Sequence, residues 1–246
     1  MPQPDKNELD LLIGFKVENW TTPHRPGSEN LEGKYCRLEP LSIERHSASL
    51  FAANQRDTND RIWVYLPYGP FDTLGEYQRW LSDNCFNGDP FFYAIVDQES
   101  SEAIGVASYL RIDPTNGSIE VGHINYSPSL QNTIAATEAM YLMMKNAFDL
   151  GYRRYEWKCN SLNEKSCSAA KRLGFSYEGI FRQATVTKGR NRDTSWFAMI
   201  DLEWPVLNHA FTKWLAEDNF DENGQQRRAL SGMTQEALGS FHENND

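Results

Sequence analysis

The sequence predicts an α/β protein with a mixed sheet, and three successive patterns of residues predict that class. Two helix-forming segments come first, over residues 42–54 and 72–86. Strand-forming segments separated by turn residues follow over residues 91–126. Helices and strands then alternate up to residue 202. Leading helices, antiparallel strands and a final alternating region are typical of helices packed on a mixed sheet.

The first 30 residues are expected to form an N-terminal arm. They contain an apolar stretch, Leu9–Val17, and then the turn-rich segment Thr22–Gly27. A first strand fits Lys34–Glu39. Ser42 is a suitable N-cap for the first helix, which ends near Asn54.

The second helix follows an aromatic loop and is expected to start at Asp72 or Thr73, either of which can cap it. Strands fit Phe91–Asp97 and Ala103–Arg111. The sequence Asp-Pro-Thr-Asn-Gly at 113–117 then predicts a hairpin turn into the next strand.

The segment over residues 119–150 carries the strongest functional signal. It contains a strand, Ile119–Tyr126, a short turn, Ser127–Leu130, and a helix that opens at Gln131 and runs to about Leu150. The first N–H groups of a helix lack intrahelical partners, and the helix dipole is positive there. This arrangement can therefore bind a phosphate group without a lysine.

A second strand and helix follow, with Gly151 in the position of a C-terminal cap. The strand is Arg154–Cys159, and Ser161 begins a sequence with capping-box spacing. The helix is expected to end at Gly174.

The C-terminal third predicts a hairpin and one further helix. Strands fit Phe175–Thr187 and Thr194–Leu202, and a helix fits Val206–Ala216 before a polar tail. We therefore expect an arm over 1–30, one domain over 31–204, and a helical extension with a polar tail over 205–246.

Two motifs in this order resemble a known family. Gln131 and Ala136, followed by Thr-Glu-Ala, are similar to motif A of the GNAT acetyltransferases in the RimJ/RimL-like branch. Asn163 and Ser166, before a helix ending in Leu-Gly-Phe at 173–175, resemble the family's next motif. The resemblance covers roughly Leu31 to Trp204. It implies a GNAT-type mixed, mostly antiparallel twisted sheet flanked by helices, and an enzyme that uses acetyl-CoA.

The resemblance also implies a set of cofactor-binding residues. Backbone N–H groups near Ile124 and Asn125 would contact the acetyl oxygen, and Asn163 and Ser166 would lie near the pantetheine. The diphosphate would be held by the loop and helix start, that is by Gln131, Asn132, Thr133, Ile134, Ala135 and Ala136. Two positions depart from the family pattern: Ile134 replaces a glycine of motif A, and Ala170 stands where many relatives have a tyrosine.

Two residues of the strand over 119–126 are candidates for the base that removes the proton of an amine. His123 is the first, because its unperturbed pKa is near 6.5. Glu120 is the rival, since a glutamate on this strand orients a water in many GNAT enzymes. Regular alternation would place these two side chains on opposite faces of the sheet. Both can serve only if a β-bulge intervenes, and the family carries one here.

The remaining candidates concern the leaving group and the acceptor. Ser166 would hydrogen-bond the departing thiolate, or it is simply a residue of the first helical turn. Trp63, Tyr65 and Tyr68 lie in the loop where the family builds its acceptor site, and they would contact the acceptor or anchor the loop. Arg190, Arg192 and Asp193 fit a solvated hairpin turn, or a substrate or dimer contact.

Charge and composition limit the partners. The net charge of −10 argues against general nucleic-acid binding. Residues 151–193 nevertheless carry ten Lys/Arg and four Asp/Glu, a net +6 that leaves −16 elsewhere. This basic island either consists of solvated helix faces or faces the phosphates of coenzyme A, beside an acidic rim that attracts a cationic amine.

The chain shows no sign of a membrane segment, a secretory leader or a metal site. No apolar run reaches the roughly 20 residues needed to span a bilayer, and the start of the chain lacks a basic, apolar leader. The four cysteines form no CxxC pair and the five histidines are scattered. We therefore expect a cytoplasmic protein without a metal, a monomer or a homodimer.

These observations predict an acetyl-CoA-dependent N-acetyltransferase that transfers acetyl directly to a primary amine. The acceptor would be a protein N-terminus or a small amine. Two alternatives stay open: a detoxifying acetyltransferase for an aminoacyl compound, and a non-catalytic acyl-CoA-binding module.

Overall fold

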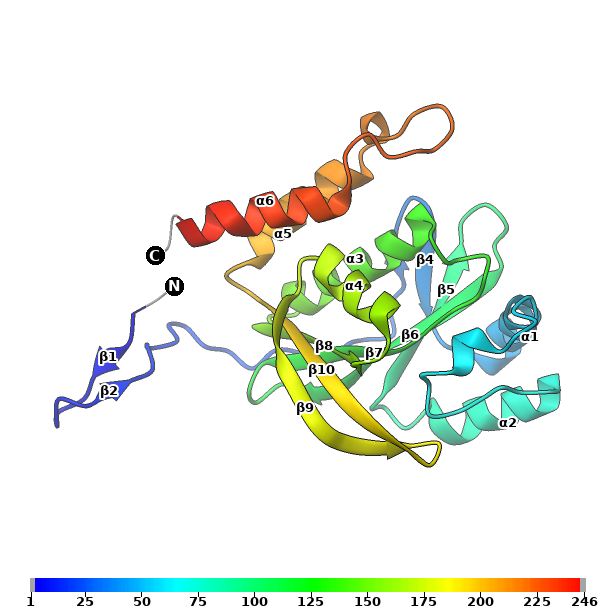
Figure 1. Ribbon diagram of the computed structural model, residues 1–246, viewed down its shortest axis with the longest axis horizontal. Coiled ribbons are helices and arrows are strands. Elements are labelled where there is room, and N and C mark those ends of the chain that lie inside the picture. Colours follow the sequence, from blue (N-terminus) through cyan, green and yellow to red (C-terminus); the bar gives the residue numbers. More distant parts are fainter. Residues whose placement is uncertain (1–2, 244–246) are drawn as a thin grey trace.

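The fold is an eight-stranded sheet flanked by helices, seen in a computed structural model that describes residues 3–243 (Figure 1). The strand order is β3-β4-β5-β6-β7-β8-β10-β9. Only β7 and β8 are parallel; the other neighbours in the sheet are antiparallel. The predicted fold class, a mixed and mostly antiparallel sheet flanked by helices, is confirmed. The strands of this sheet are β3 (Leu31–Glu32), β4 (Cys36–Pro40), β5 (Phe91–Asp97), β6 (Ala103–Asp113), β7 (Ser118–Tyr126), β8 (Arg154–Asn160), β9 (Ser176–Thr187) and β10 (Arg190–Ile200).

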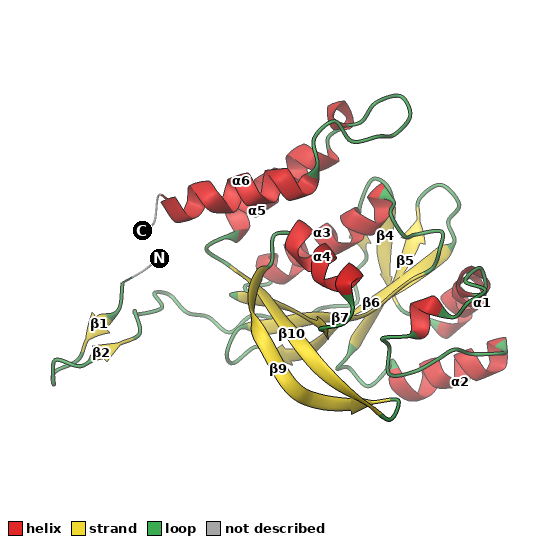
Figure 2. Cartoon of the chain, viewed as in Figure 1, coloured by secondary structure: helices red, strands yellow, loops and turns green. Residues whose placement is uncertain are grey.

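Helices cover the two faces of the sheet unequally (Figure 2). Helices α1 (Ile43–Asn54) and α2 (Leu74–Asn84) enclose a small core on one face, which includes Leu50, Leu81 and Phe92. Helices α3 (Ile134–Asp149), α4 (Glu164–Arg172) and α5 (Trp204–Leu215) bury the larger core on the other face. Helices α1 and α2 therefore cover this face over β4–β6. On the same face, over β7–β10, lies the cluster of side chains around His123.

The helix starts follow the capping residues of the sequence, with one correction. Ser42 caps α1, and Thr73 with Glu76 forms a capping box at α2. The prediction that Ser161 opens the capping box of α4 is wrong. The Asn163 side chain is the cap and accepts a hydrogen bond from the N–H of Ser166 at 3.1 Å. Ser161 instead accepts a hydrogen bond from the hydroxyl of Ser195 at 2.9 Å.

Helix α3 begins three residues later than expected. Gln131 belongs to the preceding loop, and Thr133 is the N-cap, whose side chain accepts a hydrogen bond from the N–H of Ala136. The buried carboxylate of Glu138, on the second turn, accepts three backbone N–H groups from residues 34–36, at 2.8, 2.6 and 2.8 Å. These bonds fix the start of α3 against β4.

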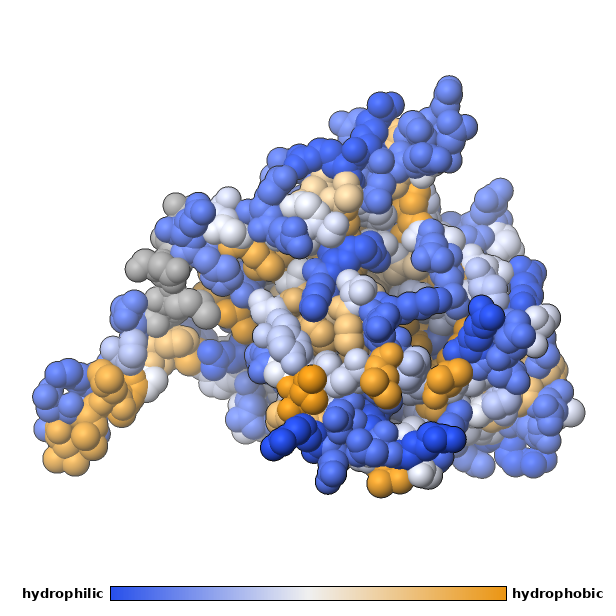
Figure 3. Space-filling view, viewed as in Figure 1, coloured by the Kyte–Doolittle hydropathy of each residue, from blue (hydrophilic) through white to orange (hydrophobic). Residues whose placement is uncertain are grey.

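The N-terminal arm projects from the domain (Figure 1). Its two short strands, β1 (Asp5–Lys6) and β2 (Leu12–Ile13), pair only with each other. Apolar side chains such as Leu9, which is 76% exposed, gather on it, as the space-filling view shows (Figure 3). Residues 1–2 of the expected arm and 244–246 of the expected tail lie outside the described residues.

The C-terminal extension contains more ordered structure than a single helix and a polar tail. After α5 and the short η2 (Glu217–Asn219), residues 230–243 form helix α6 (Leu230–Glu243). Leu230 and Thr234 are buried, and the Thr234 hydroxyl donates to the carbonyl of Arg172 at 3.2 Å. The expected polar tail is therefore wrong for this segment. Within residues 3–243, no helix is long and apolar enough to cross a membrane.

Strands β7 and β8 separate partway along their length. They are paired from Ser118 opposite Arg154 to Val121 opposite Trp157, and not beyond. On the other side of β7, Ser108 lies opposite Gly122 and Val106 opposite Asn125. One residue of β6 thus faces two of β7, which is a β-bulge. The backbone groups of residues 122–126 that face β8 therefore have no strand partner.

Candidate active site

The bulge places Glu120 and His123 on the same face of the sheet. His123 adopts a left-handed backbone conformation with φ of 49°. Its ring packs against Phe92 of the small core, with ring centroids 5.2 Å apart. The Glu120 carboxylate lies on the same side and contacts Lys158 of β8. The β-bulge that would let both Glu120 and His123 face the same site is therefore confirmed.

His123 is held in a neutral form by its surroundings. Its ring stacks on Tyr68, with centroids 5.7 Å apart and planes 13° apart, and its Nδ1 lies 3.3 Å from the Tyr68 hydroxyl. Burial, together with the charges of Arg111 and Arg192, lowers the pKa of His123 to about 4. A neutral imidazole near pH 7 is able to accept a proton, although a low pKa makes it a weak base.

Glu120 is bound by two cations. Its carboxylate is 3% exposed and lies 2.6 Å from the guanidinium of Arg111 and 2.9 Å from the Nζ of Lys158. Lys158 also contacts Glu156 at 2.6 Å. Both ion pairs use Oε2, whereas Oε1 has no hydrogen-bond partner within residues 3–243. Glu120 therefore positions the two cations through one oxygen and keeps the other available to accept a hydrogen bond.

The loop before α3 presents backbone donors at the carboxyl end of β7. The N–H groups of Gln131 and Thr133 bond to carbonyls within the loop, and Thr133 caps Ala136. The N–H groups of Asn132, Ile134 and Ala135 have no partner within residues 3–243. Three free donors at a helix N-terminus are suited to an anion.

Ile134 does not obstruct this arrangement, although it replaces a glycine of the family motif. The left-handed residue of the loop is Asn132, with φ of 62°, and Ile134 is the first residue of the helix. The Ile134 side chain packs against the larger core. It also lines, with Thr133 and Ala135, a hollow of about 470 Å³ next to residues 97–99.

The start of α4 brings Ser166 to the separated end of β8. The Ser166 hydroxyl oxygen accepts a hydrogen bond from the indole N–H of Trp157 at 3.0 Å. That bond leaves the Ser166 proton unused, and the hydroxyl also lies beside the thiol of Cys159. Asn163 uses its side-chain oxygen to cap the helix, and Ala170, in the position of the family's tyrosine, is fully buried.

The aromatic loop between α1 and α2 lies over the bulge. Tyr68 reaches His123, as described above, whereas Trp63 is 6% exposed and packs edge-on against Phe71 at 5.4 Å. The Tyr65 hydroxyl donates to the carbonyl of Leu162 at 2.9 Å. Tyr68 therefore contacts His123, whereas Trp63 anchors the loop and Tyr65 ties it to the start of α4.

The β9–β10 hairpin closes the other side of this region. At its tip, the Nζ of Lys188 donates to the carbonyls of Trp63 and Gly69, at 2.9 and 3.0 Å. Sequence reasoning did not identify Lys188, Arg111 or Lys158 as site residues. The nearest signal was the excess of cations over residues 151–193, which includes two of these three.

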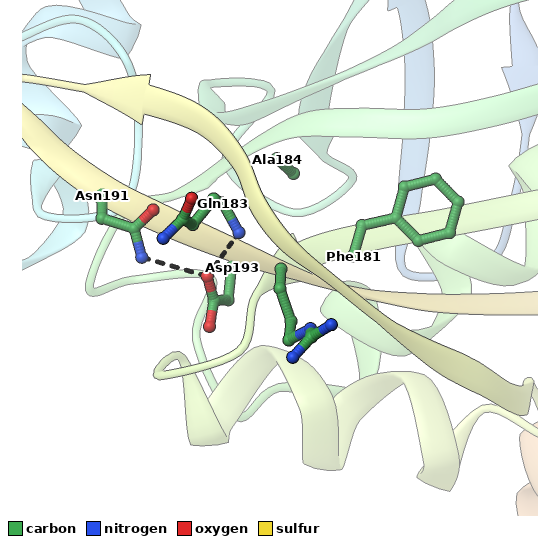
Figure 4. A pocket seen from close by; sticks show the side chains of 6 residues that line it. Phe181, Gln183, Ala184, Asn191 and Asp193 are labelled. Atoms are coloured by element: carbon green, nitrogen blue, oxygen red, sulfur yellow. Dashed lines mark hydrogen bonds between the residues drawn. The ribbon is translucent and has the colours of Figure 1, made fainter.

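A hollow of the surface lies on the hairpin itself (Figure 4). It has a volume of about 720 Å³, and its lining includes Phe181 and Asp193 but not His123. The Asp193 carboxylate accepts hydrogen bonds from the N–H of Gln183 at 2.7 Å and from the side chain of Asn191 at 3.0 Å. Asp193 thus stabilises the turn of the hairpin.

The comparisons with known proteins agree with this geometry. The family described as the acetyltransferase (GNAT) domain matches residues 36–176. A crystal structure of a GCN5-related N-acetyltransferase from Brucella melitensis is 44% identical, with a TM-score of 0.87, and covers 89% of this chain and 100% of that one.

Two curated proteins are also similar. An uncharacterized N-acetyltransferase p20 of Bacillus licheniformis is 26% identical over 68% of this chain and 99% of its own length. A ribosomal-protein-serine acetyltransferase of Escherichia coli is 32% identical over 42% of this chain and 57% of its own length. The family uses acetyl-CoA, and its RimJ/RimL-like branch includes ribosomal-protein-serine acetyltransferases. The chain therefore belongs to the GNAT family and is an N-acetyltransferase.

Proposed function

We propose that this protein transfers acetyl from acetyl-CoA directly to a primary amine of a protein N-terminus or a small molecule. The observation that carries the proposal is the bulge at His123, next to the point where β7 and β8 separate. It provides a neutral imidazole, unpaired backbone groups and a serine hydroxyl at the same end of the sheet.

The chain's own residues would bind acetyl-CoA at the start of α3. Free N–H groups of Asn132, Ile134 and Ala135 would hold the diphosphate, and the backbone groups of residues 123–125 that face away from β6 would bond the pantetheine and the acetyl oxygen. The residues present therefore fit the cofactor. When bound, acetyl-CoA supplies the thioester from which the acetyl group is taken.

Proton movements would fall to His123 and Ser166. The ammonium of the acceptor loses a proton to His123, directly or through a water, because only the free amine is a nucleophile. The C–N bond then forms, the C–S bond breaks, and the nitrogen loses its second proton. Ser166 would donate a hydrogen bond to the departing sulfur, and the second proton of the nitrogen would pass to that sulfur, directly or through a water, so that coenzyme A would leave as the thiol.

A thiol-release assay tests this function. We expect purified protein with acetyl-CoA to release free thiol in proportion to acetylated amine, over a panel of peptide N-termini and small amines. Mass spectrometry of the acceptor identifies the product. Saturable binding of acetyl-CoA with no turnover on any amine would instead support a non-catalytic acyl-CoA-binding module.

A further inference from the structure

Arg192 is a cation of the site that has no carboxylate partner. Its side chain is half-buried, and its Nε donates to the hydroxyl of Thr194 at 3.2 Å. Within residues 3–243, no Asp or Glu oxygen lies within 4 Å of its guanidinium nitrogens. A partly desolvated guanidinium without a counter-charge is unfavourable, so it is suited to an anionic ligand.

The hairpin directs Arg192 toward the reactive region. A register shift lies between Arg192 and Thr194 of β10. Because their side chains are in contact, they lie on one face. Thr194 is buried and faces Asn160, at the end of β8 where it has left β7. The charge of Arg192 also acts on His123, whose pKa it lowers, and on Glu120.

The charges around this point do not balance within the protein. Arg111 and Lys158 are neutralised by Glu120 and Glu156. Arg154, which also contacts Glu156, is neutralised by Glu178 at 2.6 Å. Arg192 therefore adds a surplus positive charge in a chain whose net charge is −10. Because the Arg192 charge has no ion-pair partner in this region, it can interact with a bound ligand.

Two contacts fix the loop that carries Tyr68 next to this region. Lys188 ties the hairpin tip to the loop over His123, and Tyr65 ties the same loop to the residues before α4. The strand that carries Arg192 and the loop over His123 are therefore held next to each other.

We propose that Arg192 binds an oxyanion of the acceptor, so that the acceptor is an amine carrying a carboxylate or a phosphate close to its nitrogen. This inference rests on the proposed function and names its substrate class. A guanidinium recognises either group through two parallel N–H donors. Arg192 is thus a specificity-determining residue, separate from the groups that move protons.

Matched pairs of acceptors test the proposal. The rate of thiol release is measured for phenylalanine against phenylalaninamide, and for phosphoethanolamine against ethanolamine. We expect wild-type kcat/KM to favour the anionic member of at least one pair by tenfold or more, and the favoured pair distinguishes a carboxylate from a phosphate. Arg192→Gln should abolish this preference, and Arg192→Lys should keep part of it. Arg190→Gln, an exposed cation two residues away, serves as the matched control and should leave the preference intact.

The outcomes separate the two proposals. Turnover of amines with equal rates in each pair, or a preference that survives in Arg192→Gln, overturns the role of Arg192 and leaves the transferase function intact. If no amine is turned over, the proposed function fails, and calorimetric binding of the same four compounds decides the inference alone. Binding of an anionic member that is lost in Arg192→Gln supports it, and absence of any such binding overturns it.

Discussion

The Nζ of Lys188 lies 2.9 Å from the carbonyl oxygen of Trp63, although 125 positions separate the two residues in the chain. A second bond, to the carbonyl of Gly69, makes this lysine a clamp between the β9–β10 hairpin and the loop over His123. The same loop supplies Tyr68, whose ring stacks on His123. The position of the imidazole therefore depends on a contact at the tip of a distant hairpin.

Removing this clamp should loosen the acceptor side of the site. In Lys188→Met we expect the KM for the amine to rise severalfold while the KM for acetyl-CoA stays constant, because Lys188 contacts neither the start of α3 nor β7, where the cofactor is proposed to bind. Limited proteolysis should cleave residues 57–72 faster than in the wild type. Arg190→Met is the matched control. Equal proteolysis rates in Lys188→Met and wild type would show that the loop holds without the lysine.

The start of α3 offers a test of the phosphate site. Ile134→Pro removes one free N–H at the first helical position, where the φ of proline is acceptable. Ile134→Ala removes the side chain and keeps the donor. We expect acetyl-CoA affinity, measured by calorimetry, to fall about tenfold or more in Ile134→Pro, since a hydrogen bond to a charged group contributes about 1.5–3 kcal/mol. If the two variants bind equally, the backbone donor of this residue does not contact the diphosphate.

The assignment of the base rests on a comparison of two variants. His123→Ala should lower kcat by roughly 10² or more, the low end for general base catalysis, and leave cofactor affinity unchanged. Glu120→Gln should act mainly through Arg111 and Lys158, which lose their counter-charge, and so should reduce stability as well as activity. Loss of activity in Glu120→Gln, with normal activity in His123→Ala, would exchange the two roles.

Ser166 should affect the rate only at the step in which the thiolate departs. Ser166→Ala is expected to lower kcat and kcat/KM together, with little change in the KM for acetyl-CoA. The indole N–H of Trp157 loses its acceptor in the same variant, so the melting temperature must be recorded beside the kinetics. Ser166→Thr, which restores a hydroxyl, is expected to recover part of the rate. A wild-type kcat in Ser166→Ala would leave the serine as a structural partner of the tryptophan.

The depressed pKa of His123 predicts how stability depends on pH. Its folded-state pKa is about 4, against about 6.5 for an unperturbed histidine. Between these pH values the unfolded chain binds more protons than the folded protein. The stability that the neutral His123 contributes is therefore fully present above pH 6.5 and is lost as pH falls toward 4. Urea unfolding at pH 7 and pH 4.5 should show a larger loss in the wild type than in His123→Gln, by up to about 3 kcal/mol. If the wild type and His123→Gln lost the same free energy of unfolding between the two pH values, the His123 imidazole would be solvated in the folded protein.

The local features of the fold could be read from the sequence, because they depend on neighbouring residues. Ser42 and Thr73 cap their helices as predicted, and the strand with His123 carries the bulge that the family resemblance implies. At α4 the sequence predicted Ser161 as the start of the cap, whereas the structure has Asn163 as the cap. Ser161 is bonded instead by Ser195 of β10, a residue 34 positions away.

The remaining features depend on contacts between distant segments. Nothing local in residues 230–243 indicates that Leu230 and Thr234 pack on the domain. The same holds for Lys188 and Arg192, which look like residues of a solvated turn. Their roles follow from the curvature of the β9–β10 hairpin over the sheet. This curvature cannot be predicted from a few neighbouring residues.

The three backbone bonds to Glu138 have a consequence for how this enzyme acquires its cofactor site during folding. The carboxylate on α3 and the amides of residues 34–36 are about a hundred positions apart, so this contact has a high sequence separation and a large entropy of loop closure. The helix can form early, but its anion-binding end becomes fixed only when β4 joins the sheet. A chain that has lost or misplaced β4 should therefore retain the helix and yet fail to retain acetyl-CoA.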